Sequence, residues 1–145
     1  MIAVIDFGSQ YTQLIARRIR ECHVYSEIIS CRAGASVLRG KDIEGIVLSG
    51  GPGSVYETNI EAHSELFSLG VPVLGICYGM QLGAQLFGGR VRKSKSREYG
   101  LAHLTHMADP LFARVPKRIN VWMSHGDTVT MIPRRGHLIG RTDST

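Results

Sequence analysis

The sequence lacks an uninterrupted apolar run of the roughly 20 residues that a membrane-spanning helix needs. It also lacks a charged and then apolar leader, since strand-like residues begin at Ile2. Cysteine is scarce: the sequence has only Cys22, Cys31 and Cys77, without a Cys-x-x-Cys spacing. Neither a zinc site nor a disulfide framework is therefore indicated. Together these absences favour a cytoplasmic protein with no membrane partner.

Positive charge is present but not concentrated. The 145 residues carry a net charge of +5, and most of the basic residues are scattered along the chain. The densest run lies within residues 90–97 and contains no aromatic side chain, which a groove for single-stranded nucleic acid would need. We therefore expect no nucleic-acid partner, and interpret the run as a solvated rim or as a docking patch for an acidic partner surface. Its basic members are Arg90, Arg92, Lys93, Lys95 and Arg97.

The hydrophobic pattern predicts one α/β domain over residues 1–145. Strands are predicted at 2–6, 24–30, 43–49 and 71–77, and helices at 11–21, 60–69 and 78–87. Nearly continuous apolar strands that alternate with helices predict an open, mainly parallel sheet with helices on both faces. Beyond Gly89 the pattern changes to short strands and predicts a small antiparallel annex. These strands are expected at 91–95, 101–105, 119–124, 128–132 and 137–141.

The most informative segment is Gly-Ile-Cys-Tyr-Gly at residues 75–79, directly after an apolar run. Its two glycines allow a tight turn from strand to helix that exposes the central side chain, as in the nucleophile elbow of hydrolases. The amino end of a helix also favours the thiolate form of a cysteine. Cys77 is therefore a candidate covalent nucleophile. The alternative is a small buried cysteine at the end of a core strand.

A glycine-rich loop, Gly-Gly-Pro-Gly-Ser at residues 50–54, follows another predicted strand. Ligands bind beyond the carboxyl ends of strands in open parallel sheets, so we expect this loop, residues 7–10 and the Cys77 turn to converge there. Amide groups in such a loop could hold a phosphate or a developing oxyanion. Because no Gly-Lys-Ser or Gly-Lys-Thr follows, the oxyanion interpretation is favoured over a phosphate loop. An ordinary glycine-rich turn is the alternative.

A third segment, Val-Trp-Met-Ser-His-Gly-Asp at residues 121–127, begins with alternating apolar residues and ends in four residues that predict a polar turn at 124–127. His125 could be a general base that completes a pair with Cys77. It could equally be a turn residue whose neighbouring backbone contacts a substrate. The sequence alone does not choose between these two hypotheses.

Taken together, four segments resemble class I, triad-type glutamine amidotransferases, and among these the glutaminase portion of GMP synthases. The resemblance covers essentially the whole chain and implies a flavodoxin-like fold. The first segment, at 6–21, is Asp-Phe-Gly-Ser-Gln-Tyr-Thr-Gln-Leu-Ile-Ala-Arg-Arg-Ile-Arg-Glu. The others are Ser-Gly-Gly-Pro-Gly-Ser at 49–54, Gly-Ile-Cys-Tyr-Gly-Met-Gln at 75–81 and the segment at 121–127.

The resemblance implies a mechanism. Cys77 would attack the side-chain amide of glutamine, release ammonia and leave a glutamyl thioester that water hydrolyses. The backbone amides of Gly51 and Tyr78 resemble the family's oxyanion hole, in which one donor is typically worth about 10²–10³ in rate. The residues that resemble the family's glutamine-binding pocket are Gly53, Gln81, Ser124, His125, Gly126 and Asp127.

The resemblance also implies a partner, the ATP-pyrophosphatase synthetase domain or subunit. There ATP and magnesium would activate xanthosine monophosphate, and ammonia would displace AMP to give GMP; no cofactor or metal is implied in the present domain. The family's base and its carboxylate come from a His-Pro-Glu motif that these 145 residues do not contain. We therefore expect a domain that is incomplete at its C-terminus and hydrolyses glutamine poorly or not at all.

Three other interpretations stay open. A DJ-1-like cysteine hydrolase would explain Cys77 and the sheet, but not the loop at 50–54 together with the segment at 124–127. A non-catalytic docking module for the synthetase partner would explain the basic run. A marginally stable fragment would leave an exposed sheet edge that invites aggregation.

Overall fold

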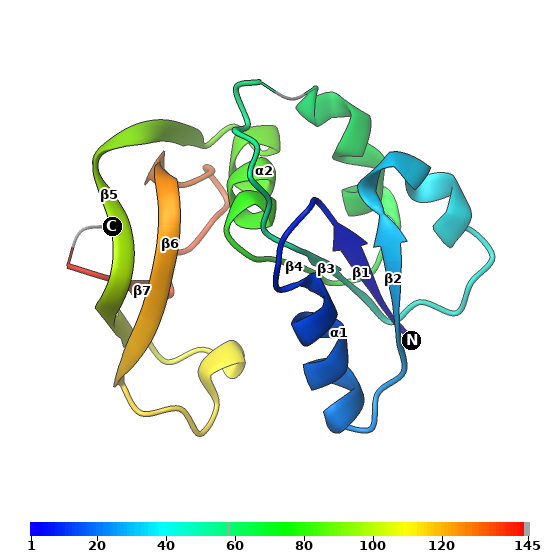
Figure 1. The fold of residues 1–145 in the computed structure, drawn as a ribbon, viewed down its shortest axis with the longest axis horizontal. Coiled ribbons are helices and arrows are strands. Elements are labelled where there is room, and N and C mark those ends of the chain that lie inside the picture. The colour runs from blue at the N-terminus through cyan, green and yellow to red at the C-terminus, as the bar shows by residue number, and fades with distance from the viewer. Residues whose placement is uncertain (58, 144–145) are drawn as a thin grey trace. The chain divides into compact units, whose positions relative to one another are not determined.

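The computed structural model describes residues 1–57 and 59–143, with the backbone alone at residues 94–99. The chain divides into two compact units, Met1–Leu86 and Phe87–Thr145, and each unit is described by itself. The first holds a parallel sheet with helices and the second an antiparallel sheet (Figure 1), so the predicted fold class is confirmed. No helix in the described part of the chain is long and apolar enough to cross a membrane.

The first unit is built on a parallel sheet with the strand order β2-β1-β3-β4. Val4 of the first strand lies opposite a residue of each neighbour, Ile28 on one side and Val47 on the other. Every strand falls inside its predicted range, and the two central strands, β1 and β3, show the apolar runs that burial on both faces requires. The strands are β1 (Ile2–Asp6), β2 (Ser26–Ser30), β3 (Gly45–Leu48) and β4 (Val73–Gly75).

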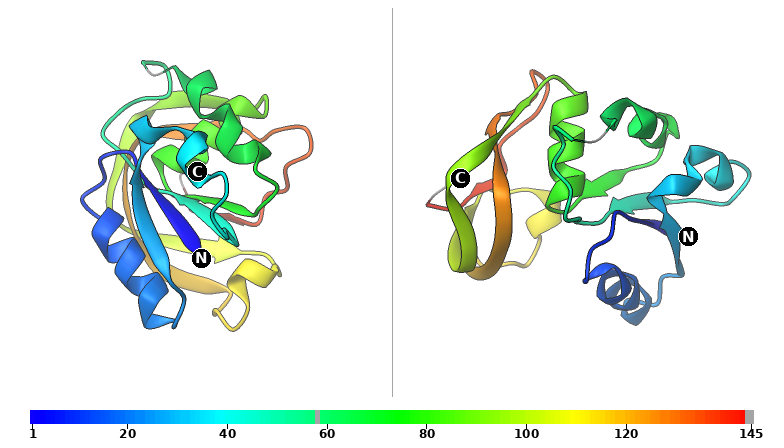
Figure 2. Two further views of the ribbon diagram at one scale, coloured as in Figure 1. Left: turned by 90° about the vertical axis from the view of Figure 1, so that its right-hand side faces the viewer. Right: turned by 45° about the horizontal axis from the view of Figure 1, so that its top comes forward.

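Helices cover both faces of this sheet, as predicted. α1 (Thr12–Glu21) connects β1 to β2, the 3-10 helix η3 (Ile60–Ser68) connects β3 to β4, and α2 (Tyr78–Leu86) follows β4. Because right-handed connections that run toward opposite edges place their helices on opposite faces, α1 and η3 lie on different sides. Figure 2 shows this arrangement, with α2 on the side of η3. Two short 3-10 helices after β2, η1 (Cys31–Ala33) and η2 (Ala35–Leu38), were not predicted.

The helix predicted at 60–69 is present as η3, which is a 3-10 helix and not an α-helix. Ser64 Oγ donates to the carbonyl of Glu61, three residues earlier, at 2.8 Å. A side-chain bond of this kind competes with the regular α-helical ladder. Gly70, just past the end of η3, has φ of +76°, the left-handed conformation in which glycine commonly ends a helix.

Apolar side chains on the two faces of the sheet form the core of the first unit. Toward α1, Val4 and Val47 pack with Ala16 of the helix. On the opposite face, alternation along the strands buries Ile5 and Leu48, which are 1% and 0% exposed. The partly buried residues packed on the α1 side are Ile2, Ile15, Ile19 and Ile28.

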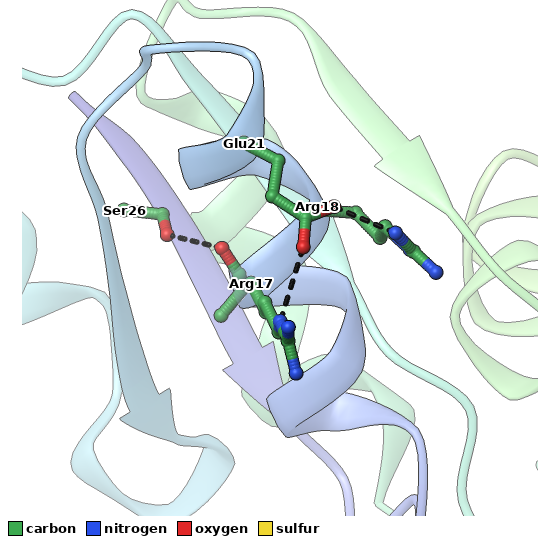
Figure 3. A network of polar contacts seen from close by, with 5 residues as sticks. Arg17, Arg18, Glu21 and Ser26 are labelled. Carbon is green, nitrogen blue, oxygen red and sulfur yellow. Dashed lines mark hydrogen bonds and ion pairs between the residues drawn. The ribbon is translucent and has the colours of Figure 1, made fainter.

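A buried hydrogen bond connects α1 to β2. Ser26 Oγ, on a residue that is 1% exposed, donates to the Ala16 carbonyl at 3.0 Å (Figure 3). Such a bond contributes about 1 kcal/mol to stability. On the exposed side of α1, Arg17 and Arg18 form ion pairs with Glu21 at 3.0 and 2.6 Å. Because these pairs are exposed, they contribute little.

The second unit is a three-stranded antiparallel sheet in the order β6-β5-β7. Four of the predicted short strands merge in pairs, because the pairing of β5 with β6 resumes at Glu98 and His125 after an irregularity. The strand expected at 137–141 is reduced to two residues. The elements are β5 (Arg90–His106), the 3-10 helix η4 (Pro110–Phe112), β6 (Arg118–Met131) and β7 (Gly140–Arg141).

The polar turn predicted at 124–127 is wrong, since these residues lie inside β6. Lys93 pairs with Asp127 and Glu98 pairs with His125, so residues 94–97 of β5 lie opposite Gly126 alone. The extra residues therefore lie in β5, as in a β-bulge, and the polar residues 124–127 stay within β6. Of the basic run, Lys95 and Arg97 lie outside the residues whose side chains are described.

Candidate active site

Cys77 lies at a sharp turn between β4 and α2. Its φ is +51°, in the left-handed region that residues other than glycine rarely adopt. A strained backbone of this kind costs about 1–3 kcal/mol and is found most often at functional sites. The side chain is half-buried, and the cysteine is not in a disulfide. Cys77 therefore has the backbone geometry and the partial exposure that the nucleophile-elbow hypothesis requires.

The two glycines that flank Cys77 are required by space. A Cβ atom on Gly75 would lie 2.5 Å from the amide nitrogen of Met80. A Cβ atom on Gly79 would lie 2.5 Å from both the Cβ and the carbonyl oxygen of Leu48. Real Cβ atoms do not approach backbone atoms this closely, so only glycine fits at either position. The Gly-x-Cys-x-Gly pattern thus sets how closely α2 approaches β3.

Backbone hydrogen bonds fix the amino end of α2 beside Cys77. The Cys77 carbonyl accepts the Gln81 amide at 3.0 Å, which makes Cys77 the residue from which the helix starts. The Gly79 amide donates to the Ser49 carbonyl at 3.2 Å and ties the first turn to the end of β3. The positive end of the helix therefore lies next to the thiol, where it favours negative charge.

The glycine loop at 50–54 contacts the cysteine turn. The position of a Cβ on Gly50 is 3.5 Å from the Cys77 Cβ and 3.6 Å from Ser9 Oγ. A Cβ on Gly8 would similarly lie 3.4 Å from the side chain of Pro52. The three loops at the carboxyl ends of β1, β3 and β4 therefore meet, as the sequence predicted.

Ser49, the last residue before the glycine loop, was missed in the sequence analysis. It is completely buried. Its hydroxyl accepts the Phe7 amide at 3.0 Å and donates to the Gly50 carbonyl at 2.8 Å. A serine that closes an apolar strand immediately before two glycines was the available signal, because a hydroxyl there can bond to loop backbone.

Aromatic side chains pack beneath the loops. The Phe7 ring contacts that of Tyr78, with centroids 5.1 Å apart, and that of His63 at 5.0 Å, edge to face. Such pairs stabilise by about 0.5–1.5 kcal/mol beyond the area that they bury. Burial lowers the pKa of His63, since the charged form loses hydration. Phe7 thereby links the end of β1 to η3 and to α2.

The structure brings together part of the predicted site. Cys77 and Gly51 belong to the meeting loops of the first unit, and Tyr78 is the first residue of α2. Gln81 follows Cys77 by one helical turn and is 4% exposed, whereas Gly53 is exposed at the tip of its loop. The residues of β6, Ser124, His125, Gly126 and Asp127, belong to the second unit, and their predicted contact with substrate stays a prediction.

A hollow at the other edge of the sheet is not a competing site. Its lining includes Met1, Tyr25, Lys41 and Glu44. The Met1 ammonium pairs with Glu44 at 2.8 Å and Lys41 with Glu27 at 2.6 Å, so these charges already satisfy one another. The hollow also lies at the amino ends of β1 and β2, away from the edge where parallel sheets bind ligands. Within the described ranges, no three His, Cys, Asp or Glu side chains gather as a metal site would need.

Comparison with known protein families gives a match over nearly the whole chain. The family profile described as "Glutamine amidotransferase class-I" matches residues 3–144. Among curated proteins, the glutamine-hydrolysing GMP synthases of Gloeothece citriformis and Synechocystis sp. are 49% and 51% identical over 148 residues. That of Staphylococcus aureus is 49% identical over 146 residues. Each match covers 100% of this chain but only 27–28% of the relative, so the chain spans about a quarter of these proteins.

Solved structures that resemble this chain agree with the family match. A Thermoplasma acidophilum protein described as part of a GMP synthase superposes with a TM-score of 0.89 at 31% identity, over 99% of this chain and 73% of that one. A glutamine amidotransferase of Thermotoga maritima gives a TM-score of 0.80 at 24% identity, over 99% of this chain and 67% of its own. The second likeness concerns the fold alone.

Proposed function

Because this chain belongs to the class-I glutamine amidotransferase family, we propose that it is a glutaminase unit with Cys77 as its nucleophile. One observation carries the proposal: Cys77 adopts φ of +51° at the start of α2, with its Cβ 3.5 Å from the Cβ position of Gly50. This geometry presents a thiol to a substrate between a helix N-terminus and a glycine loop. An inert core cysteine has no need of the strained backbone or of the two flanking glycines.

The proposed reaction has two steps. The Cys77 thiolate forms a bond to the carboxamide carbon of glutamine, and the carbonyl oxygen takes the negative charge. The C–N bond then breaks, the nitrogen leaves as ammonia after taking a proton, and a glutamyl thioester remains. Water attacks this thioester in the second step, which releases glutamate and restores the thiol.

The other roles follow the family pattern. The amides of Gly51 and Tyr78 would stabilise the oxyanion, and each such donor is worth about 10²–10³ in rate. Gly53, Gln81 and residues 124–127 would hold the α-amino and α-carboxylate groups of glutamine. The 145 residues contain no His-Pro-Glu sequence to supply the family's base, so we expect slow turnover of glutamine by this chain.

The ammonia would serve the synthesis of GMP. The relatives at 49–51% identity are glutamine-hydrolysing GMP synthases, which supports this assignment. In that setting a synthetase domain or subunit uses ATP and magnesium to activate xanthosine monophosphate, and ammonia from this unit displaces AMP. The partner of the present chain would therefore be an ATP-pyrophosphatase synthetase.

Covalent labelling tests the proposal without requiring turnover. The probe is the chloromethyl ketone analogue of L-glutamine, in which a CH2Cl group replaces the amide NH2. The Cys77 thiolate adds to the ketone carbon and gives a tetrahedral oxyanion, as it would with the amide. The sulfur then moves to the neighbouring carbon and displaces chloride, which restores the ketone and leaves a stable thioether. We expect one adduct per chain at Cys77 by peptide mass spectrometry, suppressed by L-glutamine but not by L-asparagine.

Cys31 provides the matched control, since it is also half-buried and not in a disulfide. Cys31→Ser should be labelled like the unmodified protein, whereas Cys77→Ser should not be labelled. Labelling that L-glutamine fails to suppress, or that spreads evenly over Cys22, Cys31 and Cys77, would overturn the proposed function.

A further inference from the structure

Ser49 has no part in the two-step reaction, although it lies directly before the glycine loop. It is completely buried, and its hydroxyl both donates and accepts a hydrogen bond. The oxygen accepts the Phe7 amide at 3.0 Å, and the hydroxyl donates to the Gly50 carbonyl at 2.8 Å. A hydroxyl held from both sides cannot rotate freely. Ser49 therefore links the end of β1 to one particular peptide group of the loop.

That peptide group is the one whose amide belongs to Gly51. The described residues contain no cis peptide bond, and in a trans peptide the C=O and N–H groups point in opposite directions. Because Ser49 holds the Gly50 carbonyl inward, the Gly51 N–H is turned to the opposite side. The backbone of Gly51 is also packed so tightly that a Cβ there would lie 2.5 Å from the Phe7 carbonyl oxygen. The Gly51 backbone is therefore in close contact with the residue that follows β1.

We propose that Ser49 is a positioning residue of the glutaminase site. It orients the Gly50–Gly51 peptide so that the Gly51 N–H faces the carboxamide oxygen, which becomes negatively charged when Cys77 attacks. The inference rests on the proposed function and extends it to a side chain that acts through Gly51. An oxyanion donor is effective only when it is oriented before the reaction, because reorienting it would consume the energy that it supplies.

A comparison of two labelling rates tests this role. Ser49→Ala removes the hydroxyl, and labelling is followed with the chloromethyl ketone and, separately, with iodoacetamide. We expect the maximal labelling rate of the ketone to fall by about tenfold, below the 10²–10³ that removing a donor outright costs. The half-saturating ketone concentration should change less than about twofold, because the oxyanion donor acts mainly as charge develops. Reaction with iodoacetamide should change equally little, since it needs the thiolate but no oxyanion donor.

Ser26 provides a matched control. It is 1% exposed, and its hydroxyl donates to the Ala16 carbonyl at 3.0 Å, so Ser26→Ala also removes a buried hydroxyl bond to backbone. This variant should lose stability but keep both labelling rates. Ser49→Thr, which retains the hydroxyl, should recover most of the ketone rate. If Ser49→Ala does not fold, Ser49→Cys fills nearly the same space with a weaker donor and should show a smaller loss of the same kind.

The outcomes separate the inference from the proposed function. If the unmodified protein is labelled at Cys77 and Ser49→Ala is labelled equally fast, the positioning role is wrong while the glutaminase proposal stands. A parallel loss of the ketone and iodoacetamide rates also overturns it, because it shows general damage to the cysteine turn. If the unmodified protein is not labelled at all, the proposed function fails and the role of Ser49 fails with it.

Discussion

The two edges of the parallel sheet are stabilised in different ways. At the carboxyl edge, backbone packs directly on backbone, as where Gly79 lies against Leu48. At the amino edge, exposed charges pair across the surface, as where the Met1 ammonium meets Glu44 at 2.8 Å. The first kind of contact admits no extra atom. The second can be replaced by water at little cost.

This difference shows where the sequence is constrained. Close backbone packing at the carboxyl edge holds Cys77 in a left-handed conformation that costs about 1–3 kcal/mol, and the surrounding hydrogen bonds must offset that cost. The amino edge holds no reacting group and needs no such rigidity. The same type of substitution should therefore change stability by different amounts at the two edges.

Gly79→Ala should have the largest effect on stability. Its new Cβ would meet Leu48 at 2.5 Å, so α2 must move away from β3. We expect a loss of about 2–3 kcal/mol, which is typical of forced overpacking. The measurement is urea denaturation of the first unit, monitored through the hydrogen exchange of the β1 and β3 amides. Hydrogen exchange of β5 and β6 amides reports on the second unit as an internal reference.

Gly83 gives the control in the same helix. A Cβ on Gly83 would meet the Phe67 ring at 3.5 Å, an ordinary contact. Gly83→Ala should therefore stabilise the first unit by up to about 1 kcal/mol, through its higher helix propensity. Equal effects of the two substitutions would mean that close packing does not distinguish the turn at Cys77 from the rest of α2.

Cys77→Gly should be more stable than Cys77→Ala by about 1 kcal/mol. Glycine adopts positive φ without strain, whereas alanine keeps the Cβ that opposes it. Both variants lack the thiol, so their difference isolates the backbone. His23 is the comparison at the amino edge, since it has φ of +59° after α1. His23→Gly should likewise have a higher free energy of unfolding than His23→Ala in denaturation experiments. Both variants should still be labelled at Cys77. A more stable Cys77→Ala would refute the strain at the turn.

Sequence patterns predicted the parallel sheet well because its constraints are local. Apolar runs marked all four strands, and two glycines around Cys77 marked the turn. The contact of the glycine loop with that turn could also be predicted, since carboxyl ends of parallel strands meet at one edge. The contact of Ser49 with Phe7 could not be predicted from sequence, because Phe7 is 42 residues away and is brought close only by the pairing of β1 with β3.

The antiparallel sheet was predicted less well for a related reason. Polar residues at 124–127 favour a turn when only local propensity is considered. Cross-strand pairing with β5 keeps them in β6, and the irregular residues of β5 absorb the mismatch. Long-range pairing thus outweighed local preference, as tertiary context commonly does in sheets.

The smallest expected effect is a difference in pH dependence between the two edges. Burial lowers the pKa of His63 from 6.5, so the unfolded state binds a proton more readily and stability falls as pH drops below about 6.5. The Met1 ammonium lowers the pKa of Glu44 from 4.5, so its contribution is present above that pH and is lost as pH falls through the lowered pKa. His63→Gln should flatten the stability curve between pH 7 and 5, whereas Glu44→Gln should leave that interval unchanged and alter the curve only below about 4.5. Denaturation midpoints across this range decide the matter, and an unchanged slope in His63→Gln would show that burial of this ring does not couple the carboxyl edge to pH.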